Sequence, residues 1–186
     1  MTSHTTAAAS AAGTAQHSPL QARCRVPSPL GPLTLAATAA GLAGVWFDDQ
    51  KHHPGELHTP EQPGQQWLTL AATELQRYFA GQLQQFRVPL DPQGTAFQQQ
   101  VWQALLHIAY GRLSTYGQLA RQLGRPAAAR AVGAAVGRNP LGIIVPCHRV
   151  LGQNGTLTGY AGGLHRKQAL LKLEGAPVQQ VLELAA

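Results

Sequence analysis

The sequence predicts a two-domain protein of the α/β (α+β) class, in which a small antiparallel β-sheet with one helix precedes a helical domain containing a helix-turn-helix. Short apolar runs alternate with Gly and Pro turns over residues 24–47, the pattern of β-hairpins. Apolar residues recur at helical spacing in residues 67–79 and 97–108. The net charge also differs between the two predicted domains. Residues 1–94 carry five basic and six acidic side chains, a net of −1, whereas residues 95–176 carry nine basic and one acidic, a net of +8.

Composition limits the class of protein. The chain has 186 residues, of which 44% are hydrophobic. No uncharged apolar run reaches the roughly 18 residues that a membrane-spanning helix needs. Two cysteines, Cys24 and Cys147, are too few for a disulfide scaffold. Residues 1–20, rich in Ala, Thr, Ser and His, show no apolar periodicity and predict a disordered tail. We therefore expect a soluble, cytoplasmic protein.

Residues 21–90 predict the N-terminal α/β domain. A Pro- and Gly-rich turn at residues 27–32 separates short apolar runs that can pair as strands, and residues 67–79 form a helix that Gly81 ends. Residues 86–94 contain two prolines and predict a linker. The polar loop before the helix carries three histidines, His52, His53 and His58. Since no cysteine lies near them, we interpret these histidines as solvated loop residues rather than a metal site.

Residues 95–176 predict the C-terminal domain. Its first helix, over residues 97–108, is followed by Thr115, which precedes Gln118 by three residues in the spacing of a capping box. A Gly-Arg-Pro turn and a second short helix over residues 127–136 complete a helix-turn-helix. The second helix of this motif normally enters a groove of DNA, and the surrounding charge of +8 supports that interpretation.

This second helix has almost no side-chain bulk. It consists mainly of Ala and Gly, and Arg130 is its one long side chain. Such a helix can approach a narrow groove closely. Close packing against another helix is the alternative, and it would account for part of one face.

A reactive cysteine is indicated at Pro146-Cys147-His148-Arg149-Val150. A buried apolar run ends at the proline, which forces a turn, and a base and a positive charge follow the thiol at once. Most free cysteines are inert buried residues, which is the simpler interpretation. Because neighbouring side chains on a strand point apart, His148 can serve Cys147 only through irregular backbone or a bridging water.

This segment resembles the active-site signature of the O6-alkylguanine-DNA alkyltransferases. Five further motifs carry the resemblance: Ser114-Thr115-Tyr116-Gly117-Gln118-Leu119-Ala120, Ala129-Arg130-Ala131-Val132-Gly133, Asn139-Pro140, Gly159-Tyr160-Ala161-Gly162-Gly163-Leu164 and Leu173-Glu174-Gly175. It extends from Phe97 to Gly175, and the hairpin-rich first half looks like the variable N-terminal domain of the family. The resemblance implies a ribonuclease H-like first domain and a winged-helix-like second one.

The resemblance also implies a role for each matching residue. Cys147 would take the alkyl group from guanine O6 as a thiolate. His148 would accept the thiol proton through water, and Glu174 would orient and stabilise the resulting imidazolium. Asn139 would tie the turn before the cysteine to this relay, and Tyr116 would donate its hydroxyl to guanine N3. The expected base pocket consists of Val150, Tyr160, Ala161, Gly162 and Gly163.

The target atom lies inside the stacked duplex, so the resemblance implies that the base is flipped out and that Arg130 fills its place from the minor groove. The expected DNA contacts are Tyr116, Ala129, Arg130, Ala131, Gly133 and Arg149. We expect a monomer that repairs double-stranded DNA in one irreversible transfer per molecule, with O4-alkylthymine as a further candidate substrate. No cofactor is expected. Some relatives hold zinc in the first half, but Cys24 is the only cysteine available there, so we expect no metal.

Three other functions fit parts of the pattern. A DNA-binding regulator could use Cys147 as a redox or alkylation sensor, but a sensor needs no base pocket. A non-catalytic relative that only flags alkylguanine lacks the acceptor cysteine, which this chain has. A Cys/His hydrolase is disfavoured by the basic surface and by the absence of an obvious oxyanion-loop signal.

DNA binding should be largely independent of sequence, because basic side chains on phosphates carry no base code. The affinity for undamaged duplex should fall by roughly 10³-fold or more between about 50 and 200 mM salt if at least six phosphates are neutralised. Fluorescence anisotropy with several unrelated duplexes measures both properties. A strong preference for one duplex would instead favour the regulator.

Overall fold

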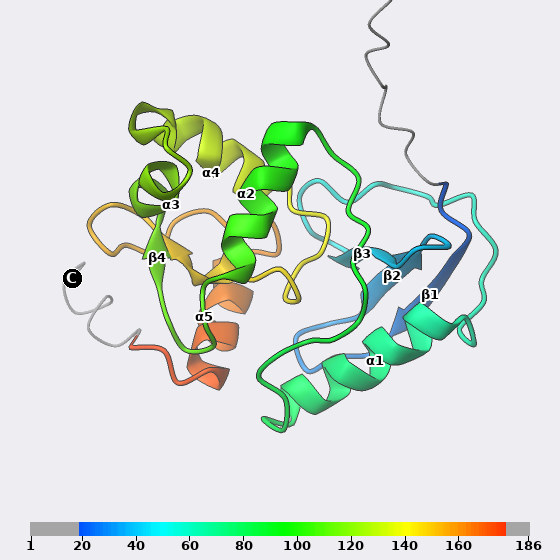
Figure 1. The fold of residues 1–186 in the computed structure, drawn as a ribbon. Helices are drawn as coiled ribbons and strands as arrows, with labels where there is room; N and C mark the ends of the chain where they lie inside the picture. Colours follow the sequence, from blue (N-terminus) through cyan, green and yellow to red (C-terminus); the bar gives the residue numbers. More distant parts are fainter. Residues whose placement is uncertain (1–18, 178–186) are drawn as a thin grey trace, which may run out of the picture.

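The computed structural model describes residues 19–177, so that the tail predicted for residues 1–20 lies almost wholly outside the described residues. The first half contains β1 (Ala22–Val26), β2 (Leu33–Ala37), β3 (Leu42–Phe47) and α1 (Gln66–Phe79). The second half contains α2 (Ala96–Leu106), β4 (Ser114–Thr115), α3 (Tyr116–Gln122), η1 (Pro126–Ala128), α4 (Ala129–Gly137), η2 (Cys147–Arg149), β5 (Val150–Leu151) and α5 (Leu164–Leu173). Figure 1 shows the sheet and α1 beside a cluster of the other helices. The predicted mixed α/β class is confirmed.

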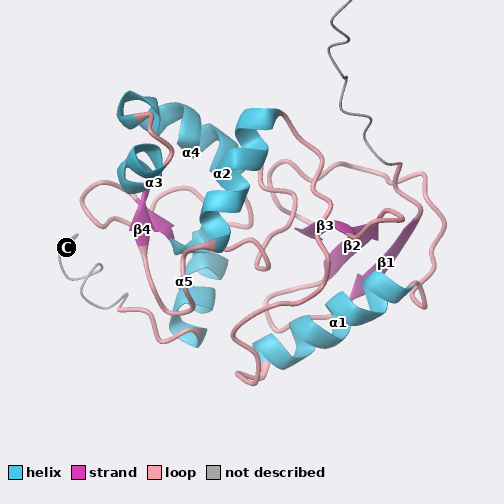
Figure 2. Ribbon diagram, in the orientation of Figure 1, coloured by secondary structure: helices cyan, strands magenta, loops and turns pink. Residues whose placement is uncertain are grey.

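The three strands of the first half form an antiparallel sheet in the order β1-β2-β3. Strand β3 is buried along its whole length, because α1 packs on the sheet and the second half lies against it. Helix α1 begins where the side chain of Gln65 accepts hydrogen bonds from the backbone N–H groups of Trp67 and Leu68, and it buries Leu68, Leu75 and Tyr78. The expected sheet of hairpins and the helix at residues 67–79 are therefore confirmed (Figure 2).

The segment between the two halves is fixed to α1. The buried carboxylate of Glu74 accepts hydrogen bonds from the backbone N–H groups of Arg87 and Val88 at 3.0–3.1 Å. Further along, Leu90 bridges to Leu42 of β3. These contacts hold the predicted linker against the first half instead of leaving it free.

The helix-turn-helix lies in α3 and α4. Thr115 and Gln118 form the predicted capping box at the start of α3, with both reciprocal hydrogen bonds present. Helix α4 buries Val132, Ala135 and Val136 and exposes its opposite side. Its Ala135 carbonyl accepts a hydrogen bond from the indole of Trp102 on α2 at 2.9 Å. Both interpretations of the small residues of α4 therefore hold. One face of the helix packs closely inside the protein, and the other face remains open to solvent.

Short strands β4 and β5 pair in parallel, with Ser114 opposite Val150 and Thr115 opposite Leu151. Strand β4 leads directly into α3, and β5 directly follows η2. This small sheet therefore brings the first residue of α3, Tyr116, near the turn that carries Cys147.

The two halves pack on one continuous apolar core. Arg166 of α5 connects them, because its guanidinium donates to the carbonyl of Leu30, forms an ion pair with Asp49 at 2.7 Å and lies 4.2 Å from the centre of the Phe47 ring. Backbone hydrogen bonds join Val45 of β3 to the segment before the cysteine. Within residues 19–177, no helix has the length and apolar character to cross a membrane.

Candidate active site

A 3₁₀ turn presents Cys147. The apolar run that precedes it is buried as predicted, and the turn is closed by a hydrogen bond from the Arg149 N–H to the Pro146 carbonyl at 3.0 Å. A turn of this kind, unlike a strand, allows three consecutive side chains to take separate directions. Cys147 faces a pocket, whereas His148 and Arg149 join a buried polar cluster behind it. The irregular backbone expected here is therefore present.

Asn139 binds the cysteine sulfur. Its side-chain amide donates to the Sγ of Cys147 at 3.1 Å and to the carbonyl of Val145 at 2.8 Å. Its side-chain oxygen, Oδ1, accepts a hydrogen bond from the backbone N–H of Leu141 at 3.0 Å. Asn139 is itself buried, so these bonds hold the loop before the cysteine and orient the sulfur together.

Glu174 is the centre of the polar cluster behind the turn. Its carboxylate lies 2.8 Å from the Nε2 of His148 and accepts two hydrogen bonds from the guanidinium of Arg149, at 2.8 and 2.9 Å. Tyr78 donates its hydroxyl to the same carboxylate at 2.7 Å, and Gly111 donates its N–H at 3.3 Å. Burial by itself would raise the pKa of Glu174, but the hydrogen bonds from His148 and Arg149 outweigh burial and hold that pKa well below its ordinary value.

His148 is fully buried, and burial lowers its pKa although Glu174 acts in the opposite direction. The imidazole is therefore neutral at neutral pH. We assign its proton to Nε2, because the ionised Glu174 can only accept. The other nitrogen, Nδ1, is buried and has no hydrogen-bond partner among the described protein atoms. A neutral histidine with its Nδ1 unengaged can take up a proton.

Burial also raises the pKa of the Cys147 thiol, while the hydrogen bond from Asn139 and the charge of Lys167 act in the opposite direction. The cysteine thus rests as a thiol and needs a base to react.

Lys167 is a site residue that the sequence analysis missed. Its side chain is fully buried, and its ammonium donates to the carbonyls of Val150, Thr158 and Gly159, the latter two at 2.8 and 3.4 Å. Burial lowers its pKa to about 8. A signal was available, because Lys167 precedes the buried Leu170 and Leu171 by three and four residues and so lies on the buried face of α5.

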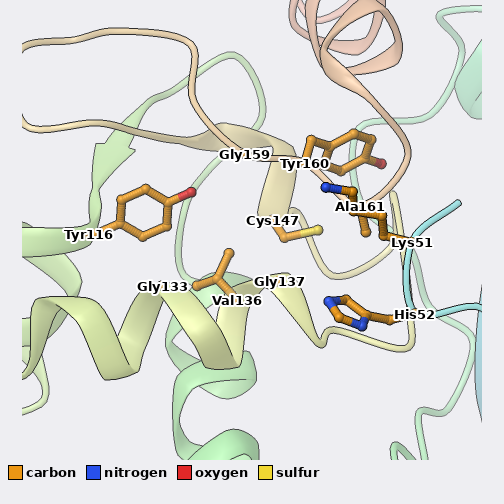
Figure 3. Close-up of a pocket in the computed structure, with 10 residues that line it drawn as sticks. All are labelled: Lys51, His52, Tyr116, Gly133, Val136, Gly137, Cys147, Gly159, Tyr160 and Ala161. Carbon is orange, nitrogen blue, oxygen red and sulfur yellow. The ribbon is translucent and has the colours of Figure 1, made fainter.

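Figure 3 shows the pocket of about 210 Å³ that Cys147 faces. Among the predicted site residues, Tyr116, Gly133, Cys147, Tyr160 and Ala161 line it. The lining also includes five residues that were not predicted for it: Lys51, His52, Val136, Gly137 and Gly159.

Three residues expected in the base pocket lie outside its lining. Val150 is buried in β5 and gives its carbonyl to Lys167. Gly162 gives its carbonyl to Arg166, and Gly163 precedes the first turn of α5. These residues support the pocket wall rather than face its interior.

Two of the three loop histidines, His52 and His58, are exposed, as expected for solvated loop residues. His52 lines the pocket, and the ring of His53 meets the edge of Trp46. Within the described part of the chain, no three His, Cys, Asp or Glu side chains gather as a metal site would require.

The face of α4 with Arg130 is open. A groove of about 640 Å³ lies along it, and it adjoins the cysteine pocket at Tyr116 and Gly133, which line both. Six basic side chains of the second half are exposed: Arg112, Arg121, Arg125, Arg130, Arg138 and Lys172.

The prediction that Arg149 contacts DNA is wrong. Its guanidinium is buried and is occupied by Glu174 and by the carbonyl of Ile108, because a charge removed from water needs such partners. Arg166 and Lys167 are buried as well. Three of the nine basic residues of the second half are therefore structural.

Comparisons with known proteins find relatives that match both halves of the chain. The family described as 6-O-methylguanine DNA methyltransferase, DNA binding domain, matches residues 96–176, and the ribonuclease-like domain of the same name matches residues 25–92. The methylated-DNA–protein-cysteine methyltransferase of Mycobacterium tuberculosis is 52% identical over 149 residues, which cover 80% of this chain and 89% of the relative. The protein of that name from Haemophilus influenzae is 47% identical over 154 residues, covering 81% and 84%.

Solved structures give the same result. The crystal structure of the Mycobacterium tuberculosis O6-methylguanine methyltransferase superposes with a TM-score of 0.75 at 48% identity, covering 88% of this chain and 98% of that one. A structure of the mycobacterial protein in complex with DNA gives a TM-score of 0.76 at 48% identity, covering 87% and 98%.

The charge of Lys167 should control the reactivity of the thiol. Lys167→Met removes the cation that favours the Cys147 thiolate, so alkylation should slow at neutral pH, and the difference should shrink above about pH 8, where Lys167 itself loses its charge. We expect labelling by chloroacetamide to slow roughly three- to tenfold at neutral pH. Labelling rates across pH 6 to 10, read at the Cys147 peptide by mass spectrometry, measure the difference.

The matched control is Lys172→Met, which removes a lysine from the exposed side of the same helix. Its pH profile should match that of the parent protein. Thermal unfolding should first show that both proteins are folded. Identical pH profiles for Lys167→Met and the parent would then contradict the role given to Lys167.

Proposed function

The chain belongs to the family of methylated-DNA–protein-cysteine methyltransferases, and we propose that Cys147 is the residue to which it transfers the alkyl group. The protein repairs DNA by direct reversal, through irreversible transfer of an alkyl group from O6-alkylguanine. One observation carries the assignment of Cys147. This sulfur faces a pocket next to the helix-turn-helix, while Asn139 binds it and the His148–Glu174 pair lies behind its turn.

The reaction begins with the thiol proton. We propose that it passes through a water molecule to the Nδ1 of His148, and that the ionised Glu174 stabilises the imidazolium that forms. The burial that raises the thiol pKa makes this base necessary. Arg149 and Tyr78 hold the carboxylate in place, so they are positioning residues.

The thiolate then attacks the alkyl carbon in line with the bond to O6. A sulfur–carbon bond forms, the carbon–O6 bond breaks, and its electron pair goes to the guanine. Tyr116, at the far end of the pocket, donates its hydroxyl to N3 as negative charge develops on the base. The product is a thioether, which is a poor leaving group, so each molecule acts once.

The protein binds DNA, as its mycobacterial relative does in a crystal. We propose that it acts as a cytoplasmic monomer on double-stranded DNA and approaches the minor groove with the open face of α4. The groove beside α4 adjoins the pocket at Tyr116 and Gly133, so a base flipped from a duplex bound there has a short distance to cover to Cys147. Arg130 is exposed on this face, flanked by the small residues Ala129, Ala131 and Gly133, and can fill the space that the base leaves.

The assignment predicts a single methyl group on one peptide. Incubation with a duplex that contains one O6-methylguanine should add one methyl group to the Cys147 peptide, at no more than one equivalent per protein. Cys147→Ser should transfer nothing and still bind the duplex. Cys24→Ser is the matched control, because Cys24 is buried in β1 away from the pocket, and it should react as the parent does. Transfer beyond one equivalent, or methylation of another residue, would contradict the proposal.

Glu174→Gln should slow transfer by roughly ten- to several-thousandfold at neutral pH, because it removes the charge that stabilises the imidazolium while nearly preserving shape. The deficit should shrink as pH rises, since hydroxide then removes the thiol proton without the relay. DNA affinity should stay unchanged or rise slightly. Single-turnover rates across pH 6 to 10, with affinities measured alongside, test these expectations.

Tyr78→Phe serves as the comparison variant. It removes one hydrogen bond to the same carboxylate but leaves its charge, so its effect should be much smaller. Transfer by Glu174→Gln at the parent rate and neutral pH would remove Glu174 from the mechanism.

A further inference from the structure

The pocket has two ends, and the acceptor sulfur lies between them. Figure 3 shows Tyr116 on one side of Cys147 and the pair Lys51 and His52 on the other. Lys51 and His52 follow β3 in the first half of the chain, whereas the rest of the lining comes from the second half. The N-terminal domain therefore forms one end wall of the reaction site.

Hydrogen bonds hold the backbone of this end wall in place. The backbone N–H of Lys51 donates to the carbonyl of Ala161 at 2.9 Å, which fastens the loop to the opposite wall. The preceding turn is closed by hydrogen bonds between Phe47 and Gln50 in both directions. His52 has a φ of 60°, in the left-handed region, which histidine occupies more readily than most residues other than glycine.

The end wall is positively charged. Lys51 carries an ammonium group, and no carboxylate lines the pocket. The two neighbouring acids are engaged elsewhere, because Asp48 pairs with Arg25 at 2.6 Å and Asp49 pairs with Arg166 at 2.7 Å. Among the residues that the structure describes, Lys51 forms no ion pair, so its charge is available to a ligand.

The orientation of the flipped guanine determines which part of the adduct contacts this end wall. If Tyr116 binds N3, as proposed above, the O6 edge of guanine points in the opposite direction, since N3 and O6 lie on opposite sides of the base. The first carbon of the adduct then meets Cys147, and any longer part of the alkyl group extends toward Lys51 and His52. This step rests on the proposed function.

We propose that Lys51 and His52 determine the specificity for the adduct, by binding the carboxylate of an anionic alkyl group such as carboxymethyl on guanine O6. Lys51 supplies the charge, and the imidazole of His52 supplies a hydrogen-bond donor. The steps are the same as in methyl transfer. The sulfur–CH₂ bond forms, and the CH₂–O6 bond breaks with its electron pair going to guanine. The thiol proton goes to His148. The product is S-carboxymethylated Cys147.

The experiment compares three duplexes that carry O6-methylguanine, O6-carboxymethylguanine and O6-carbamoylmethylguanine. The last is a neutral analogue of almost the same shape. Single-turnover rates are measured for the parent, for Lys51→Gln and for His52→Asn, since asparagine tolerates a positive φ. Arg77→Gln is the matched control, because it removes one exposed positive charge from the same half, on α1 and outside the pocket.

We expect Lys51→Gln to reduce the ratio of the carboxymethyl rate to the carbamoylmethyl rate about two- to fivefold, the range of a partly solvated ion pair. His52→Asn should reduce it less, and Arg77→Gln should leave it unchanged. Methyl transfer by Lys51→Gln should fall by less than carboxymethyl transfer does, because the methyl group does not extend to the end wall.

Two other results are distinguishable. Equal slowing of all three duplexes by Lys51→Gln would mean that Lys51 binds a DNA phosphate, and parent rates on all three would mean that it binds no anion in the site. Either result overturns the specificity proposal and leaves the proposed function intact. Absence of methyl transfer by the parent itself would overturn both.

Discussion

The buried carboxylate of Glu174 is the constraint on which the rest of the site depends. An ionised group removed from water must be compensated by nearby partners, and here the partners come from segments far apart in the chain. His148 and Arg149 approach from the cysteine turn, and Tyr78 approaches from α1. The demand for compensation therefore fixes the turn, the last helix and the N-terminal domain against one another. The same contacts give His148 its tautomer, so stability and reactivity share one cluster.

Burial sets the resting state of the acceptor. It favours the thiol form of Cys147 and the neutral form of His148, the protonation states from which the proposed transfer starts. A protein that reacts once gains from such a cysteine, because thiolate exposed to every electrophile would be consumed without repair. Asn139 and Lys167 act against the effect of burial, because the hydrogen bond of the one and the charge of the other lower the pKa of the Cys147 thiol.

The N-terminal domain takes part in the site although the reactive motif lies outside it. Tyr78 reaches the carboxylate, and Lys51 and His52 close one end of the pocket. Arg166 connects the halves through an ion pair with Asp49 and a contact with an aromatic ring. Because the end wall depends on this packing, changes in the interface between the halves should affect which adducts fit, beyond their effect on stability.

The sequence by itself determined the local features: the hairpins, the capping box before α3, the small residues of α4, and the turn that joins Cys147 to His148. Each depends on neighbouring residues, and the resemblance then supplied Glu174 and Asn139. The burial of Arg149 and the position of His52 in the pocket lining were decided only by the tertiary structure. The physical reason is that a charged side chain becomes buried when remote segments offer it partners, and no local pattern records which segments will meet.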